Sequence, residues 1–373
     1  MTIPLVDLTA QRRTIQTELD AAMQAVIRDN AFIQGPYAAT FEREFADFCQ
    51  ARCCVGVGNG TDALYLALRA LGVGPGDTVM VPAMTFVATA EAVTLTGATP
   101  AFVDVDPSTF TMDPDDLCRK LVPSAKAVIP VHLYGHPASM EEIDAIAREH
   151  ELFVVQDAAQ AHGATFQGHP LAAFGTCCCY SFYPGKNLGA YGDAGGVVTN
   201  DAVLAEQVRK LANHGRTAKY GHDFPGVNSR LDGLQAAILS VKLPRLDLWT
   251  ASRRQVADWY DAGVAALPDI VAPVTGPGAG HVYHLYVIQC RKRDALKRSL
   301  AEQGIASGIH YPTAVPFLPA YANMNHGPED FPVAHAMQSR VLSLPMYPEL
   351  DEMQVARICA AITDWATGLA GEE

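Results

Sequence analysis

Short runs of apolar residues alternate with amphipathic stretches through the first two-thirds of the chain. The runs are nearly continuously apolar, as strands buried on both faces are, and they cover 53–57, 78–82, 100–105, 127–133, 152–156, 177–182 and 195–199. Between them lie the helical candidates 61–71, 86–96, 139–150 and 201–213. This alternation predicts an α/β fold with a mainly parallel seven-stranded sheet covered by helices.

The pattern changes in the last third of the chain. Residues 231–266 predict one long helical region that breaks or kinks near Pro244. A stretch rich in Pro and Gly, 267–280, then leads to an expected strand, helix, strand and terminal helix at 281–290, 293–303, 306–311 and 350–369. We therefore predict two domains, a large α/β domain of residues 1–250 and a smaller C-terminal α+β domain of residues 251–373.

Composition and charge narrow the possible functions. The formal net charge of −13 disfavours nucleic acid and anionic membranes as partners, because both favour a basic surface. No apolar run reaches the roughly 18 residues of a membrane span, and the N-terminus does not resemble a signal peptide, so we expect a cytoplasmic protein. Nine cysteines are then expected to be reduced, and Cys177–Cys179 is interpreted as part of a buried strand.

Residues just beyond the strand ends are the candidates for chemistry, because parallel sheets bind ligands at the carboxyl ends of their strands. Gly58-Asn59-Gly60-Thr61-Asp62 follows the first strand and leads into a helix. Its glycines and free helix-start amides could form a phosphate cup, although a simple helix cap explains the same residues.

Two further strand ends carry a carboxylate and a lysine. Asp157 follows the strand 152–156, and Lys186 follows the strand 177–182 and a Pro-Gly turn. A carboxylate can keep the pyridine nitrogen of pyridoxal phosphate (PLP) protonated, and a lysine amine can form a Schiff base with its aldehyde. Taken alone, Asp157 also reads as a helix cap and Lys186 as a surface lysine. The order of cup, carboxylate and lysine along one sheet favours the cofactor site.

At these residues the chain resembles the DegT-type nucleotide-sugar aminotransferases, which have the fold-type I PLP architecture. The resemblance covers nearly the whole chain. It rests on the segments Asp157–Gly163, Ser181–Gly189, Asn228–Asp232, Pro130–Gly135 and Ile309–Pro312.

The resemblance implies a role for each matching residue. Lys186 would form the Schiff base with PLP, Asp157 would pair with the pyridine nitrogen, and Gln160 would lie near the ring hydroxyl. Phe86 would stack on the ring, and Gly60, Thr61 and Ser181 would hold the phosphate. Asn228 would reach the phosphate of a neighbouring subunit, which implies a homodimer with shared active sites.

The resemblance also suggests a substrate. It is strongest for the branch that transfers an amino group from L-glutamate to a dTDP-linked 3-keto-6-deoxy sugar, and it places Tyr183, His310 and Tyr311 near that sugar. An aminotransferase for a 4-keto or uronate nucleotide sugar, a sugar dehydratase and a non-catalytic PLP-binding regulator are the alternatives. The dehydratases replace the lysine with histidine, so Lys186 favours transamination.

Five further residues bear on the site. Gln156 stands where the family usually has an acid, but it should face away from the site because neighbouring strand residues point to opposite faces. Pro316 and Leu318 replace commoner polar residues and leave the exact sugar open. His132 and His136 suggest no third metal ligand, so we expect no metal site.

Overall fold

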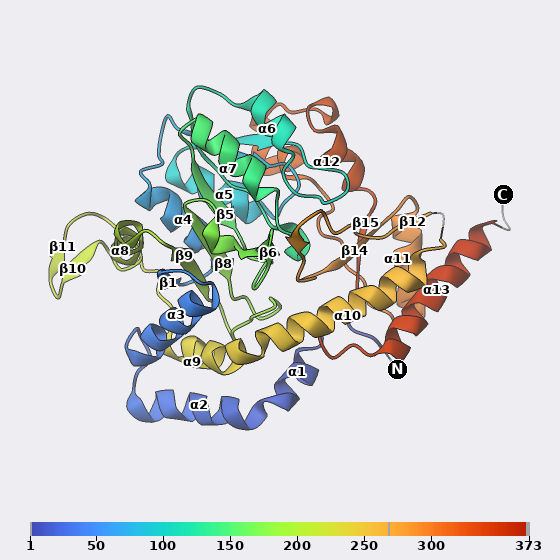
Figure 1. The fold of residues 1–373 in the computed structure, drawn as a ribbon, viewed down its shortest axis with the longest axis horizontal. Helices are drawn as coiled ribbons and strands as arrows, with labels where there is room; N and C mark the ends of the chain where they lie inside the picture. Colours follow the sequence, from blue (N-terminus) through green and yellow to red (C-terminus); the bar gives the residue numbers. More distant parts are fainter. Residues whose placement is uncertain (1, 268, 371–373) are drawn as a thin grey trace.

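The computed structural model describes residues 2–267 and 269–370 of the 373-residue chain. The helices are α1 (Leu8–Thr14), α2 (Gln16–Asp29), α3 (Pro36–Phe48), α4 (Gly60–Ala70), α5 (Val87–Thr96), α6 (Pro114–Lys120), α7 (Met140–Glu149), α8 (Ala202–Leu211), α9 (Gly233–Lys242), α10 (Leu246–Val264), α11 (Arg293–Glu302), α12 (Pro332–Met337) and α13 (Glu352–Ala370). Figure 1 shows how they surround the central sheet. No helix among the described residues is long and apolar enough to cross a membrane.

The strands form one large sheet and several small ones. Seven strands make the large sheet: β1 (Cys53–Val57), β2 (Thr78–Pro82), β3 (Thr99–Val103), β4 (Ala125–Val128), β5 (Phe153–Asp157), β8 (Cys177–Ser181) and β9 (Gly195–Thr199). The smaller sheets contain β6 (Thr165–Phe166), β7 (His169–Pro170), β10 (Arg216–Ala218), β11 (Gly221–His222), β12 (Ile270–Val271), β13 (Ala279–Gly280), β14 (Tyr286–Cys290) and β15 (Val341–Leu344).

The large sheet has the strand order β1-β9-β8-β5-β4-β2-β3. Only β9 runs antiparallel to its neighbours, so the predicted mainly parallel, seven-stranded α/β architecture is confirmed. The predicted strand 127–133 is too long, because β4 ends at Val128. Pro130, which has no N–H to donate, follows soon after, and beyond it the chain pairs with β5 only through the isolated bridge between Val131 and Asp157.

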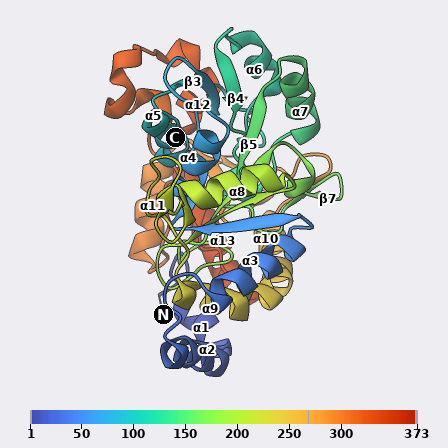
Figure 2. The same ribbon diagram turned by 90° about the vertical axis from the view of Figure 1, so that its left-hand side faces the viewer.

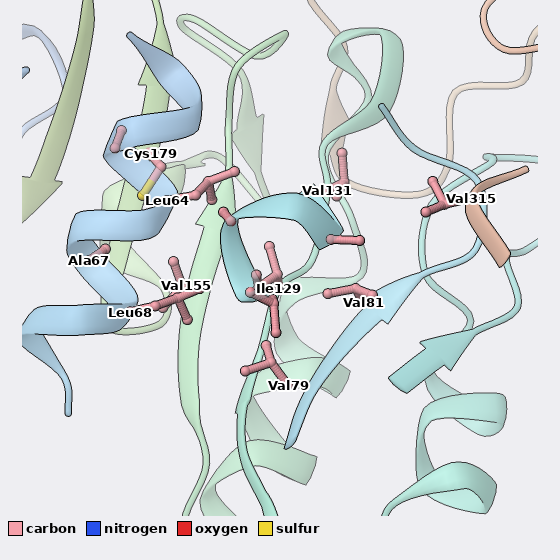
Figure 3. Packing of buried hydrophobic residues seen from close by; sticks show 14 of the residues in the cluster. Leu64, Ala67, Leu68, Val79, Val81, Ile129, Val131, Val155, Cys179 and Val315 are labelled. Atoms are coloured by element: carbon pink, nitrogen blue, oxygen red, sulfur yellow. The ribbon is translucent and has the colours of Figure 1, made fainter. Parts of the chain in front are cut away.

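Helices cover both faces of this sheet. On one face, α4, α5 and α8 pack on side chains such as Val81, Val155 and Cys179 (Figure 3). On the other face, α3 and α9 cover β1, β9 and β8, whereas α6 and α7 cover β2, β4 and β5. Figure 2 shows β1 at the sheet edge, between α8 and α3. The strands are apolar on both sides because each side faces a helical layer.

The cysteine triplet follows this layering. Cys177 and Cys179 are buried in the cluster on the α4 side, and Cys178 is buried in the cluster on the α3 side. All three are free thiols. The interpretation of the triplet as small apolar residues of a core strand is therefore confirmed.

The long helical region is broken where the sequence predicts it. A short 3-10 turn, Leu243–Arg245, separates α9 from α10, with Pro244 inside it. Beyond this break, α10 packs against α13, and the three antiparallel strands β12, β14 and β15 lie beside them (Figure 1).

The sequence-based assignment of strands in the last third is partly wrong. Residues 281–285 form no strand, and β14 begins only at Tyr286. Residues 306–311 form no strand either, but contact the sheet through the single bridge between Gly308 and Ser343. Ile309 and Tyr311 of that segment are partly buried against the core without strand pairing, and β15 supplies the third strand instead.

The domain boundary near residue 250 stays a prediction. Ile3 packs in the same apolar cluster as α10, α11 and α13. Residues of 314–337 pack in the cluster of the large sheet. Neither cluster is therefore continuous in sequence.

Candidate active site

The loop between β1 and α4 presents free backbone amides. The Asn59 side chain caps α4 by accepting from the amide of Asp62 at 2.8 Å. The amides of Gly60 and Thr61, the first two of the helix, donate no hydrogen bond within the described chain. They carry the partial positive charge of the helix start, so the helix cap is present here and two amides are left over for the phosphate cup, which stays a prediction.

Ser181, at the end of β8, lies directly against this cup. A Cβ atom at position 60 would lie 2.6 Å from the Cβ of Ser181, so only glycine fits there. The structure therefore brings Gly60, Thr61 and Ser181 to one place.

Ser229 ties the cup together, a role the sequence analysis did not assign. Its hydroxyl accepts from the amide of Gly58 at 2.9 Å and donates to the carboxylate of Asp62 at 2.6 Å. The neighbouring Asn228 is exposed and forms an isolated bridge with Asn213.

Asp157 ends β5 and is buried, with two hydrogen bonds to its carboxylate. Thr89 donates to Oδ2 at 2.8 Å, and the amide of Ala159 donates to Oδ1 at 3.1 Å. Burial raises the pKa of Asp157, against which the Thr89 hydroxyl, the Ala159 amide and the charge of Lys186 act. Thr89 itself contacts the hydroxyl of Thr85 at 2.9 Å. Sequence analysis missed Thr89, although it lies only three residues after the predicted Phe86.

Lys186 follows β8 in a turn closed by its amide, which donates to the carbonyl of Tyr183 at 2.8 Å. Burial lowers the pKa of Lys186 to about 8, and the carboxylate of Asp157 acts in the opposite direction. A substantial fraction of the amine is therefore neutral near physiological pH, and a neutral amine is the nucleophilic form.

A second wall of the site comes from distant segments. Gln160 accepts from the amide of Tyr134 at 2.6 Å and donates to the hydroxyl of Tyr311 at 3.2 Å. The Tyr134 hydroxyl donates to the carbonyl of His310. Phe86, 53% exposed, has its ring centroid 5.5 Å from that of Tyr311. The structure thus brings Phe86, Gln160, His310 and Tyr311 together.

The remaining predicted sugar residues also lie at this edge. His310 Nδ1 lies 2.8 Å from the hydroxyl of Ser343, and burial lowers the pKa of His310. Tyr183 is exposed and shares the turn of Lys186. Both side chains carry polar groups suited to a sugar carbonyl and hydroxyls.

The polar residues behind this edge have internal partners. Gln156 donates to the carbonyls of Leu171 and Phe174 and lies 3.0 Å from His132 Nε2, so it faces away from the site as expected. The amide of Gly276 donates to His136. Among the described residues, no group of three or more His, Cys, Asp or Glu side chains could hold a metal ion.

The arrangement fits the PLP that the sequence analysis expects. Free amides at a helix start and the Ser181 hydroxyl suit a phosphate, and the buried Asp157 suits a protonated ring nitrogen. Phe86 offers an exposed ring face, and Lys186 offers an amine of lowered pKa.

Comparisons with known proteins identify relatives over nearly the whole chain. The family model of the DegT/DnrJ/EryC1/StrS aminotransferases matches residues 13–363. A dTDP-3-amino-3,4,6-trideoxy-alpha-D-glucose transaminase of Streptomyces venezuelae is 44% identical over 98% of this chain and 96% of its own length. A UDP-N-acetyl-3-dehydro-alpha-D-glucosamine 3-aminotransferase of Acidithiobacillus ferrooxidans is 46% identical, covering 96% of this chain and 97% of that protein.

A solved structure gives the same picture. DesV from S. venezuelae in complex with a ketimine intermediate superposes with a TM-score of 0.96, at 44% identity, over 98% of each chain. PLP is the cofactor of these enzymes, and solved relatives carry it or its amine form.

Proposed function

The chain belongs to the DegT/DnrJ/EryC1/StrS aminotransferase family, and on that premise we propose that it aminates the 3-keto group of a dTDP-linked 3-keto-6-deoxyhexose, with L-glutamate as the donor. The observation that carries the proposal is the position of Lys186 and Asp157. Asp157 ends β5, and Lys186 follows the neighbouring strand β8. The charges of the two side chains interact.

The chain's own residues supply binding and proton transfer. When bound, PLP provides an aldehyde that condenses with amines and a ring that accepts electrons from a neighbouring carbon. The amides of Gly60 and Thr61 and the Ser181 hydroxyl hold the phosphate, and Asp157 keeps a proton on the ring nitrogen. When PLP is bound, Gln160 would lie beside the ring hydroxyl, and Phe86 would cover the ring face.

Lys186 acts as the general base and acid. As a neutral amine, its Nζ takes the proton from the α-carbon of glutamate and returns it on the cofactor side. The same atom transfers a proton in the opposite sense when the keto sugar is aminated. Tyr183, His310 and Tyr311 orient the sugar by hydrogen bonds to its carbonyl and hydroxyls.

A homodimer with shared active sites follows from the same proposal. Asn228 is exposed in the single chain, whereas its neighbour Ser229 is buried and committed to the cup of its own subunit. The amide side chain of Asn228 forms no hydrogen bond with the described residues of its own chain. It is therefore available to the phosphate of a partner subunit.

The test is to incubate the PLP-loaded protein with L-glutamate and a panel of nucleotide sugars. The panel contains dTDP-3-keto, dTDP-4-keto, UDP-linked 3-keto and uronate sugars, and 2-oxoglutarate and amino sugar are quantified by mass spectrometry. We expect the dTDP-3-keto sugar to have the highest kcat/KM, by about tenfold or more, which corresponds to the 1–3 kcal/mol of a few pocket contacts. A preference for a UDP-linked or 4-keto sugar would overturn the substrate assignment. If no 2-oxoglutarate forms with any of these sugars, the alternative of a non-catalytic PLP-binding regulator would be favoured.

A further inference from the structure

Residues 281–285, between β13 and β14, form no strand, yet hydrogen bonds fix them against the turn Leu133–Gly135, which follows β4 of the large sheet. The amide of Val282 donates to the carbonyl of Gly135 at 3.0 Å, and that of Leu285 donates to the carbonyl of Tyr134 at 3.2 Å. Tyr134 also contacts Gln160 and His310, so this segment is joined to the backbone that supports the site.

The other side of the segment is held by Arg253 of α10. This buried guanidinium donates to the carbonyls of Tyr283, His284 and Met346 at 3.1, 3.4 and 3.1 Å. The segment is therefore fixed between the large sheet and the C-terminal helices. Because this segment is fixed, it can hold in place the side chains that form hydrogen bonds with it.

One such side chain belongs to the residue that follows Lys186. Asn187 is 2% exposed, and its Nδ2 donates to the carbonyl of Val282 at 3.1 Å. Its Oδ1 lies 3.0 Å from Nδ1 of His284. Because Nδ2 is already the donor to a carbonyl, Oδ1 must accept, and His284 carries its proton on Nδ1.

His284 is uncharged in this position. Burial lowers its pKa well below the ordinary range, and the positive charges of Lys186 and Arg253 act in the same direction, with smaller contributions from His162 and His310. Its Nε2 has no hydrogen-bond partner in the part of the chain that the structure describes. The imidazole of His284 thus donates a single hydrogen bond, to Asn187, and adds no positive charge near Lys186.

We propose that Asn187 and His284 form a clasp that positions Lys186 for proton transfer. The inference rests on the proposed role of Lys186 and deepens it. The lysine side chain has four rotatable bonds, so the reach of Nζ depends on where its backbone is held, and the clasp fixes that backbone while Nζ moves. Asn187 and His284 are positioning residues, because they act through Lys186.

Paired substitutions at His284 separate the clasp from simple packing. His284→Leu removes the donor, and we expect kcat to fall about tenfold with both KM values changed less than about twofold, since small misplacements of a reacting group are costly. His284→Asn places an Nδ2–H where the imidazole Nδ1–H was, and it should restore most of kcat. Asn187→Ala should match His284→Leu, and the double variant should be no slower than either single one.

A second readout uses the apoprotein and does not depend on turnover. Lysines are labelled with formaldehyde and cyanoborohydride across a pH series and quantified by mass spectrometry. In the wild type, Lys186 should be labelled with a midpoint near its pKa of about 8. His284→Leu should raise that midpoint, because a loosened turn is better hydrated, whereas His284→Asn should leave it unchanged.

A matched control removes a different buried hydrogen bond, one formed by α10, the helix that also carries Arg253. Tyr260 of α10 donates to the carbonyl of Pro345 at 2.9 Å, and Tyr260→Phe should lower thermal stability while leaving kcat and the labelling midpoint unchanged. If Tyr260→Phe slows turnover as much as His284→Leu, or His284→Asn fails to rescue, the clasp is overturned. If wild-type Lys186 is not labelled preferentially near pH 8, the proposed role of Lys186 itself fails.

Discussion

The two sides of the candidate active site are built in different ways. On the cofactor side, Asp157 and Ser181 end neighbouring strands, so the register of β5 and β8 sets their spacing. On the C-terminal side, His310 and Tyr311 lie in an irregular segment. Hydrogen bonds from Tyr134 and Gln160, residues 176 and 151 positions away in sequence, hold that segment in place.

The difference indicates which side of the site a few substitutions can reshape. A carboxylate at a strand end is placed by a whole sheet, and few single substitutions can move it. An irregular segment depends on a few side-chain contacts, so a small number of substitutions can reshape it. We therefore expect cofactor chemistry to depend on the first side and sugar preference on the second.

The largest effect should come from the lysine of the cofactor side. Lys186→Ala should abolish turnover and the visible absorbance of the lysine-bound cofactor, because no other residue is proposed to supply the amine. Activity and absorption spectra of the purified variant measure this, with circular dichroism as the folding control. Survival of either signal would disprove the central role of Lys186.

Asp157→Asn is the next largest expected effect. It keeps the shape and can still accept from the Ala159 amide, whereas its Nδ2 would donate to the Thr89 hydroxyl. Because the negative charge is removed, kcat should fall by about 10²-fold, as for other lost electrostatic groups. The KM for the sugar should stay within about twofold, because the C-terminal side is untouched. A large rise in the KM for the sugar would contradict the proposal that cofactor chemistry and sugar binding depend on different sides of the site.

Tyr311→Phe tests the C-terminal side. It removes the hydrogen bond from Gln160, and kcat/KM for the sugar should fall about tenfold, consistent with one lost polar contact. The glutamate half-reaction, followed alone by stopped-flow absorbance, should be unchanged. Tyr321→Phe is the control, since Tyr321 packs in the large-sheet cluster and its hydroxyl lies 3.4 Å from Thr94. Equal losses in both half-reactions would contradict the comparison.

Ser229→Ala should have a smaller effect, confined to the cup. Losing the bonds to Gly58 and Asp62 should weaken PLP binding about three- to tenfold, the usual net value of one hydrogen bond. Titration of the apoprotein with PLP, followed by fluorescence, measures this. A change in sugar preference with unchanged PLP affinity would show that the cup does not serve the cofactor.

The smallest expected effect concerns stability and pH. The pKa of Lys186 is lowered in the folded protein from its ordinary 10.5 to about 8, so the unfolded chain binds the proton more tightly between these values. Lys186 therefore costs stability below about pH 8, and that cost disappears as the pH rises towards the unfolded pKa. Apoprotein of Lys186→Met should melt a few degrees higher at pH 7, with a smaller difference at pH 10. A constant difference across this range would contradict the lowered pKa.

The strands of the large sheet and the order of the chemical groups along them could be predicted from the amino-acid pattern alone. Continuous apolar runs require burial on both faces, which is why the seven strands and the alternating cysteine triplet could be predicted. Pro244 cannot continue a helix, so the break between α9 and α10 was also predictable. Asp157, Ser181 and Lys186 could be found because each lies at or just beyond the end of a strand.

The contacts between segments that are distant in sequence became visible only in the folded structure. The helices α1, α2, α3, α6 and α12 were not predicted. The supposed strand at 306–311 proved irregular, because partly buried and strand-paired segments leave similar apolar patterns. The bonds of Thr89 to Asp157 and of His284 to Asn187 join segments 68 and 97 residues apart. No local pattern encodes such pairs, since a hydroxyl or an imidazole finds its partner only when folding brings the two segments together.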